Sequence, residues 1–453
     1  MKKLTVIAFL LLLHVAAYSQ TLSLEECLQA ASENSVTVSK SALDTKAAKA
    51  LRDEARWEYV PRLSVNAIAY DALNPLLKVT LSDVLGNSDA AAVLSGNITS
   101  VAYQSGIKPY YETLSHGYGA TATLVQPLFA GGRIVNGNRL AGIGLDAASL
   151  QEELARKEVR DSVENKYWRI VALQEKEKTL QETMKLVESL EKDVQSALGA
   201  GLVTDNTLSE LEMKKAQLEA GMYRLAGSLS LLKMDLLDYA GMEYNHLEIS
   251  SLSLEGTLED LPEPEEVIAG NPGVESSAES RLLDLQVTAK ETEKRMAVGE
   301  YLPQLAVGAS YGYNALMNPD KGTMNGMIFA TLKIPVTDIG KASARAKRYN
   351  YAVQKAEKDR EYLMSRLRLR EGMCRLEVET LWKEISAAEK SVGHAEDNLN
   401  KVSARFKAGQ ATASDVLQAN LSFTEAKETL LQKKTAYKQA VNAYLSCLGE
   451  NGQ

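Results

Sequence analysis

The chain has 453 residues, of which 45% are hydrophobic and 24% are charged, and its formal net charge at pH 7 is −8. An acidic chain of this kind argues against nucleic acid as a partner. The three cysteines, Cys27, Cys374 and Cys447, lie far apart without metal-type spacing. We therefore interpret each of them as a small buried hydrophobe.

Residues 1–19 have the pattern of a secretory signal peptide. Lys2 and Lys3 form a short positive region, residues 4–13 an apolar core, and Ala17-Tyr18-Ser19 a small-residue cleavage site. The apolar run is shorter than the roughly 20 residues that span a bilayer. Cys27 does not follow a run of small apolar residues, so we expect no lipid anchor. The mature chain would be exported and would carry a net charge of −10, because cleavage removes two lysines.

Three sequence landmarks occur twice in the same order. Trp57 to Val65 returns as Gly299 to Val307, at an offset of 242 residues. Leu124 to Leu128 returns as residues 332–336, and Ala200-Gly201 returns as Ala408-Gly409, both at an offset of 208. These landmarks predict an internal duplication of roughly two hundred residues, far longer than the period of a solenoid. The predicted domains are a signal peptide over 1–19, a first repeat over 20–245, a linker over 246–265 and a second repeat over 266–453.

The difference between the two offsets places 34 extra residues in the first repeat, between Tyr70 and Tyr118. Turn signals occur at Asn74-Pro75, at residues 86–88 and at residues 95–97. We therefore predict an outward-facing loop with at most short strands, which partly covers the exit of the molecule.

Helical and alternating segments follow one another along each repeat. Residues 21–56 read as a helix, which begins at a capping box at Ser23 and ends before Pro61. Four runs then alternate with period two, each placing an apolar face opposite a small or polar face: residues 63–70, 118–126, 305–313 and 328–334. Each run has about the 9–11 residues of a tilted membrane strand. A half-buried strand of a soluble sheet has the same pattern, but four runs bordered by prolines favour membrane strands.

Two proline-free stretches predict unusually long helices. They cover residues 132–198 and 340–407, and each would be roughly 100 Å long at 1.5 Å per residue. Apolar residues recur along them at alternating spacings of three and four, as in a coiled coil. The clearest examples are Leu381, Ile385, Ala388, Val392, Ala395, Leu399, Val402 and Phe406 in the second stretch, and Val416, Ala419, Phe423, Tyr437, Ala440 and Tyr444 in the return helix.

Over essentially the whole mature chain, these residues resemble the TolC-like outer membrane efflux protein family. The resemblance rests on the helix–strand–strand–helix–helix order, the Tyr-x-Pro strand entries and the exit Pro-Leu-Phe-Ala-Gly-Gly-Arg at residues 127–133. Its most specific signs are two hairpin turns, Ala200 to Thr204 and Phe406 to Thr412, the second followed by Ser-Asp-Val-Leu-Gln-Ala at residues 414–419.

The resemblance implies an α+β membrane protein whose internally duplicated protomer forms a homotrimer. Four strands cannot close an outer-membrane barrel, which needs at least about eight. The family shares twelve strands among three chains, and this β-barrel continues as a long periplasmic α-helical coiled-coil barrel. The implied function is the exit duct of a tripartite efflux or type I secretion system in the outer membrane, extending into the periplasm. Its partners would be a periplasmic adaptor (membrane fusion protein), an inner-membrane pump and outer-membrane lipids.

The candidate site residues lie at the two predicted periplasmic turns. Asp415 stands where the family has an acidic entrance motif, Gln418 replaces the second acid of that motif, and Thr207 is the equivalent of Asp415 in the first repeat. In a trimer, Asp415 would form a ring of three carboxylates that selects cations; it would also be placed to cap the return helix. The adaptor would dock at the hairpin tips, Gly201, Leu202, Val203, Thr204, Gly409, Gln410, Ala411 and Thr412. Glycine at these turns permits the positive φ of a tight reversal.

No sequence motif indicates catalysis or a cofactor. His116, His246 and His394 are isolated, no glycine-rich phosphate loop occurs, and Gly131-Gly132 reads as a strand-to-helix bend. Met317, Met324 and Met327 suggest soft-metal export as an alternative, but they fall in a predicted outer turn. We therefore predict a passage without metal or cofactor, not an enzyme.

A stand-alone porin and a periplasmic coiled-coil scaffold are the alternative functions. The long helices argue against the porin, and the four alternating runs argue against the scaffold. Drugs, metals and secreted proteins all stay open as substrates of the predicted duct.

Overall fold

The computed structural model describes residues 21–74, 77–86, 88–107, 110–113, 116–199, 205–245, 249–269, 273–316, 322–336 and 338–448. The chain divides into two compact units. The helical unit comprises Met1–Ala48, Leu145–Val287 and Glu357–Gln453, and the sheet unit comprises Lys49–Gly144 and Thr288–Ala356. Each unit takes segments from both predicted repeats, so the repeats themselves stay a prediction.

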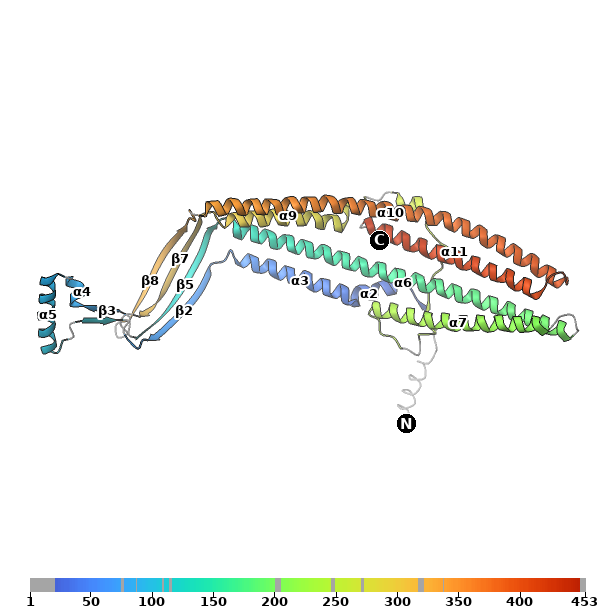
Figure 1. The fold of residues 1–453 in the computed structure, drawn as a ribbon, viewed down its shortest axis with the longest axis horizontal. Helices are drawn as coiled ribbons and strands as arrows, with labels where there is room; N and C mark the ends of the chain where they lie inside the picture. Colours follow the sequence, from blue (N-terminus) through green and yellow to red (C-terminus); the bar gives the residue numbers. More distant parts are fainter. Residues whose placement is uncertain are drawn as a thin grey trace, which may run out of the picture. The chain divides into compact units, whose positions relative to one another are not determined.

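Long helices dominate the fold, as the proline-free stretches predicted. Helix α6 (Arg133–Gly199) has 67 residues and α10 (Ile339–Lys407) has 69. The return helices are α7 (Asp205–Tyr239) and α11 (Ala413–Leu448), and each runs beside the preceding helix in the helical unit (Figure 1). Among the described residues, no helix has an apolar stretch of the length and purity that a bilayer crossing requires.

Buried residues of the helical unit follow the predicted seams. Val187, Leu190 and Val194 are buried on α6, and Ile385 and Ala388 are buried on α10. On α11 the buried residues include Val416, Ala419, Tyr437, Ala440 and Tyr444. Three hydrophobic clusters result, one of which is the packing of α6 and α7 against α2 (Leu24–Asn34) and the start of α3 (Val36–Trp57). The heptad spacing therefore predicted the core-facing sides of these helices.

The helix predicted over residues 21–56 starts later than predicted and is interrupted once. Thr21–Leu22 form strand β1, which pairs in parallel with β6 (Ser253–Leu254). The capping box is confirmed, because Glu26 N–H donates to Ser23 Oγ and Ser23 N–H donates to the Glu26 carboxylate. Ser35 then adopts an extended conformation (φ −60°, ψ 130°), which ends α2 before α3 begins. Propensity alone gave no reason for this break.

The linker region carries short elements that pack on the long helices. They are α8 (Pro264–Ile268), the 3-10 helix η1 (Val274–Ser276) and the start of α9 (Ala278–Gly299). Tyr437 on α11 is fully buried and donates a hydrogen bond of 2.6 Å to the Pro262 carbonyl. Tyr167 on α6 likewise donates to the carbonyl of Glu255, at 2.7 Å. Buried tyrosines thus fix the connecting segment to long helices at two points.

The sheet unit contains an antiparallel sheet in the order β2-β5-β7-β8 (Figure 1). Its strands are β2 (Arg62–Asp71), β5 (His116–Ala130), β7 (Gln304–Ala315) and β8 (Thr323–Lys333). All four alternating runs are therefore strands. The centre of the sheet joins β5 of the first predicted repeat to β7 of the second.

The pairing register gives this sheet two chemically different faces. Residues directly opposite each other in an antiparallel pair share a face. One face carries the rows Leu63–Leu124–Ala309–Ile328, Val65–Ala122–Tyr311–Gly326 and Ala67–Ala120–Tyr313–Met324. The opposite face carries the rows Ser64–Thr123–Ser310–Met327 and Asn66–Thr121–Gly312–Asn325. The alternation seen in each run is thus in phase across all four strands.

The passage from sheet to helix depends on three glycines. Gly131 and Gly132 connect β5 to α6 with φ values of 64° and 76°, which confirms the predicted bend. A Cβ atom on Gly131 would lie 1.8 Å from the carbonyl oxygen of Gly299, the last residue of α9. Only glycine allows these two backbones to approach so closely.

The prediction of a loop with at most short strands between Tyr70 and Tyr118 is wrong. Strands β3 (Leu77–Thr80) and β4 (Tyr110–Thr113) form a hairpin that carries helices α4 (Leu81–Leu85) and α5 (Asp89–Gln104). Ser88 caps α5 by accepting a hydrogen bond from the Ala91 N–H, at 3.2 Å. The turn signal at residues 95–97 lies inside α5, where the Ser95 hydroxyl donates to the Ala92 carbonyl. The cap at Ser88 therefore supports a helix even though Gly96 and Asn97 disfavour one.

The methionines proposed for a turn are also placed differently. Met324 and Met327 lie in strand β8, on opposite faces of the sheet, because their spacing of three is odd. Met317 lies outside the described residues. A soft-metal site built from neighbouring methionines of one turn is therefore not supported.

Candidate functional site

The turn between α10 and α11 is a compact helix C-terminal motif. Gly409 has φ 71°, as predicted from its glycine. Its N–H donates to the Phe406 carbonyl at 2.9 Å, and the Gln410 N–H donates to the Arg405 carbonyl at 2.8 Å. These two bonds form a Schellman motif, which satisfies carbonyls at the end of α10. The reversal of the chain is thereby fixed by its backbone.

Thr412 and Asp415 form a capping box at the start of α11. The Asp415 N–H donates to Thr412 Oγ1 at 3.1 Å, while the Thr412 N–H and hydroxyl both donate to Asp415 Oδ2 at 2.8 Å. The hydrogen bond from the Thr412 backbone, followed by that from its hydroxyl, lowers the pKa of Asp415 below its ordinary value, and the positive charge of Arg405 acts in the same direction. Asp415 is therefore an exposed carboxylate held in one orientation.

A groove of about 260 Å³ runs beside this cap between α10 and α11. Arg405 and Asp415 line it, together with Gln418, one helical turn further along α11. Arg405 also donates to the Gln410 carbonyl at 3.2 Å. The groove thus combines one cation, one carboxylate and the two amides of Gln418 and Asn398. Its full lining is Asn398, Val402, Arg405, Ala411, Asp415, Gln418, Ala419 and Ser422.

The ends of the two helical hairpins pack on each other through a shared core. Its buried residues are Val187, Leu190, Val194, Leu211, Ala413, Val416 and Leu417. Polar contacts join the same helices, since the Ser414 hydroxyl donates to Glu210 at 3.1 Å and the hydroxyls of Thr183 and Thr424 lie 3.2 Å apart. Lys427 further pairs with Glu182 at 3.5 Å. The position of Asp415 is therefore tied to α6 and α7 as well as to α10.

The structure places only part of the predicted site. Asp415 and Gln418 are exposed and share one face of α11, whereas Thr207 is half-buried on α7. Gln410, Ala411 and Thr412 lie in the described turn, and Gly201, Leu202, Val203 and Thr204 lie outside the described residues. Sequence reasoning missed Arg405 and Glu210. Little in the sequence indicated either residue, because exposed charged residues are common on long helices. The residues that Arg405 and Glu210 contact also belong to other elements.

Chemical groups for catalysis or metal binding do not gather at this turn. In the ranges that the structure describes, no three His, Cys, Asp or Glu side chains lie close enough together to hold a metal ion. The turn instead offers a fixed backbone and an oriented carboxylate next to a groove.

Residues 281–450 match the model of the family described as outer membrane efflux protein. This part of the chain is an outer membrane efflux protein domain. The efflux protein domain contains most of α9, strands β7 and β8, and the α10–α11 hairpin with Asp415. The match assigns the chain to the outer membrane.

Solved structures extend this likeness to the whole fold. The outer membrane protein VceC of Vibrio cholerae has a TM-score of 0.74 at 18% identity, covering 94% of this chain and 96% of that one. The CmeC outer membrane channel of Campylobacter jejuni has a TM-score of 0.74 at 14% identity, covering 94% and 85%. The open state of the MtrE outer membrane channel of Neisseria gonorrhoeae has a TM-score of 0.71 at 16% identity, covering 94% and 88%. At these identities the likeness concerns the fold. No curated protein matches the chain.

Proposed function

We propose that this protein is the outer-membrane exit duct of a tripartite efflux or type I secretion system. It would act as a homotrimer and pass substrates from an inner-membrane pump and a periplasmic adaptor to the outside. The protein would supply a path rather than a reaction. Its efflux protein domain and the channels that share its fold support this function.

The observation that carries the proposal is the two-faced open sheet. Within the described ranges, β2 and β8 each pair on one side only. An open edge in hydrocarbon leaves backbone N–H and C=O groups without partners, so a sheet of this kind must close with others. Three copies would bring twelve strands into one barrel, with the row of Leu63 facing lipid and the row of Ser64 facing water. In the single chain, Ile328 of the apolar face is 90% exposed.

An apolar stripe on α10 supports the same assembly in the helical unit. Leu369, Met373 and Leu376 follow the spacing of a coiled-coil seam, and each is more than half exposed in the single chain. Tyr362 lies one heptad before Leu369 and is exposed as well. Neighbouring copies would cover this stripe and so continue the barrel as a tunnel of helices in the periplasm.

The hairpin turns would form the entrance of the duct. In a trimer the three Asp415 carboxylates would stand in one ring, which favours cations. Arg405 beside each carboxylate, and Gln418 in place of a second acid, would weaken that preference. The adaptor would dock on the tips around Gly409 to Thr412 and on the equivalent turn at Gly201 to Thr204, and opening would require the two hairpins to part.

A strain that lacks the gene provides the test. We expect it to accumulate a toxic compound or to lose a secreted protein, and we expect the wild-type gene to restore export. The protein should fractionate with the outer membrane as heat-modifiable trimers. A soluble periplasmic protein would indicate a coiled-coil scaffold, and unchanged export with open-pore conductance would indicate a stand-alone porin. Either result would refute the proposal.

A further inference from the structure

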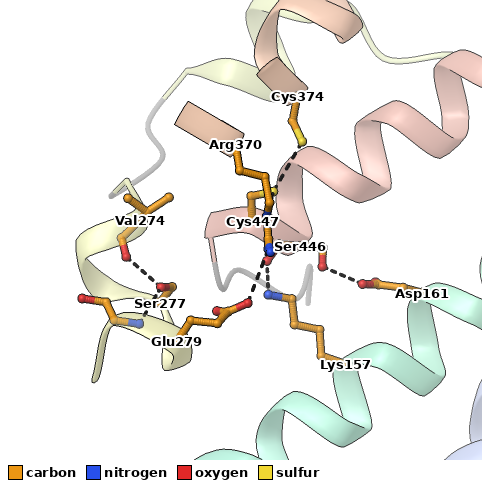
Figure 2. Close-up of polar contacts among 10 residues, drawn as sticks. Lys157, Asp161, Val274, Ser277, Glu279, Arg370, Cys374, Ser446 and Cys447 are labelled. Atoms are coloured by element: carbon orange, nitrogen blue, oxygen red, sulfur yellow. Dashed lines mark hydrogen bonds and ion pairs between the residues drawn. The ribbon is translucent and has the colours of Figure 1, made fainter. Parts of the chain in front are cut away.

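Two cysteines lie side by side at the carboxyl end of α11. The sulfur atoms of Cys374, on α10, and Cys447, on α11, are 3.4 Å apart (Figure 2). Both are free thiols in this structure. A disulfide needs a sulfur–sulfur distance of about 2.05 Å, so a small movement of the two side chains would allow the bond to form. The third cysteine, Cys27, is fully buried in another hydrophobic cluster, formed around α2, α6 and α7.

The end of α11 is held in place from a second side by α6. Buried Lys157 donates a hydrogen bond to the Ser446 carbonyl, which is one of the carbonyls that a helix C-terminus leaves without an intrahelical partner. The Ser446 hydroxyl donates to Asp161 Oδ2 at 2.6 Å. These contacts fix the backbone next to Cys447 in the folded chain, so its thiol is held beside that of Cys374 (Figure 2).

Arg370 adds an electrostatic contribution. Its Nε–H donates to Cys447 Sγ at 3.1 Å, and its guanidinium also contacts Glu279 at 3.4 Å. This contact places a positively charged side chain next to one sulfur of the pair. The cluster therefore combines proximity, a fixed backbone and a positive charge beside one sulfur.

We propose that Cys374 and Cys447 form an intrachain disulfide in the exported protein. The oxidant is a protein disulfide of the compartment outside the cytoplasm, where thiol-oxidising enzymes act. One cysteine thiolate attacks that disulfide and forms a mixed disulfide, which releases the first thiol of the oxidant. The second cysteine thiolate attacks the mixed disulfide and releases the other. Two protons and two electrons leave the cysteine pair, and the oxidant becomes a dithiol.

The timing of the bond follows from burial. Burial, then the neighbouring Cys447, raises the pKa of Cys374 to about 12, so its thiolate is scarce once the chain is folded. Cys447 is buried in the folded chain and poorly accessible to an oxidising enzyme. We therefore expect the disulfide to form while the chain folds after export.

The bond would close the α10–α11 hairpin into a covalent ring. Cys374 and Cys447 are 73 positions apart, and the ring between them includes the capping box and the turn at Gly409. The hairpin tips would stay free to move, while the middle of α10 would stay joined to the end of α11. This inference rests on the proposed function only for the compartment in which the chain is oxidised.

Counting free thiols tests the bond directly. The full chain is extracted from membranes, denatured with a maleimide-linked polyethylene glycol of 5 kDa, and resolved by electrophoresis with or without prior reduction. We expect one labelled cysteine, Cys27, before reduction and three after it. Cys374→Ala should show two labels under both conditions, and Cys27→Ala should show none before reduction and two after it.

Three labels before reduction in the membrane-extracted protein would overturn the proposal, as would a disulfide that links separate chains. A protein that fractionates with the cytoplasm would refute the proposed export function instead. The disulfide is then decided by refolding the purified, denatured chain with copper phenanthroline as oxidant, so that both thiols are accessible while the chain folds. One remaining label there supports the pairing, and three labels overturn it.

Discussion

Thr412 and Asp415 satisfy each other's hydrogen bonds at the start of α11, with donor–acceptor distances between 2.8 and 3.1 Å. The carboxylate of Asp415, which we predicted from the sequence to select cations, thus also caps a helix. The two roles are compatible, because a cap uses one carboxylate oxygen while the charge stays exposed. They can be separated by changing one partner at a time.

Thr412→Ala removes the hydroxyl of the cap and keeps the charge of Asp415. Asp415→Ala removes that charge and the two hydrogen bonds that the carboxylate accepts from Thr412, but keeps the hydroxyl. We expect both variants to lower the thermal midpoint slightly and to leave trimers in the membrane. Only Asp415→Ala should reduce cation preference and cation block in planar bilayers. Equal ion selectivity in the two variants would mean that Asp415 acts as a cap alone and that the narrow point of the duct lies elsewhere.

Asp161 provides a test of pH dependence. Burial raises its pKa, against the opposing effects of the Ser446 hydroxyl and of Lys157, Arg160 and Arg370. The folded chain therefore takes up this proton at a higher pH than the unfolded chain, whose Asp titrates at about 3.9. The contribution of Asp161 to the free energy of unfolding is greatest at low pH. It is lost as the pH rises through the pKa of Asp161 in the folded chain.

Asp161→Asn should therefore raise the thermal midpoint relative to wild type at pH 7, and this gain should shrink towards pH 4. Asparagine can still accept the hydrogen bond from Ser446, so packing at the end of α11 is preserved. Ser446→Ala is the control for the loss of that bond alone. The opposite result is that the thermal midpoint of Asp161→Asn, compared with wild type, is lower at pH 7 than at pH 4. It would show that the ionised carboxylate stabilises the fold.

Thr123 and Leu124 are neighbours on β5 and belong to opposite faces of the sheet. A lysine near the middle of the lipid-facing side of a barrel costs about 2–4 kcal/mol. We expect Leu124→Lys to abolish assembly in the outer membrane, as measured by heat-modifiable trimers in that fraction. Thr123→Lys should assemble and lower the conductance for cations. The reverse pattern would mean that the apolar face lines the lumen.

Gly131→Ala would place a methyl group against the Gly299 carbonyl and would require a strained positive φ. We expect a loss of folded protein at the growth temperature. Gly142→Ala, within helix α6, is the control, because a Cβ atom there would meet nothing within 4 Å. It should stabilise by about 0.5–1 kcal/mol, since alanine favours helix over glycine. Equal folded yields for both variants would show that the strand-to-helix bend tolerates a side chain.

Periodicity predicted the regular elements well, because long helices and alternating strands repeat one local rule over many residues. The seam of Val416 and Tyr437, the faces of the four strands and the positive φ of Gly409 are all confirmed. The break at Ser35 and the helix α5 were not predicted. The break depends on the extended conformation of Ser35, and α5 begins at the cap formed by Ser88.

Contacts between segments distant in the chain were beyond sequence reasoning. The cysteines were interpreted as separate small hydrophobes, yet Cys374 and Cys447 are brought together by the antiparallel return of α11. The same return places Arg405 beside the groove at Asp415. Neither contact can be recognised from a pattern in the local sequence. The length of the helices and the geometry of the turn determine which residues of α10 and α11 meet.

The oligomeric state in mild detergent tests the central claim most directly. Light scattering on the purified protein, with the detergent contribution subtracted, should give the mass of three chains. Circular dichroism should show that the protein keeps the strand content of β2, β5, β7 and β8. Ile328→Lys, on the exposed apolar face of the edge strand β8, should reduce the trimer fraction. A stable monomer with the full strand content would contradict a shared barrel and, with it, the proposed duct.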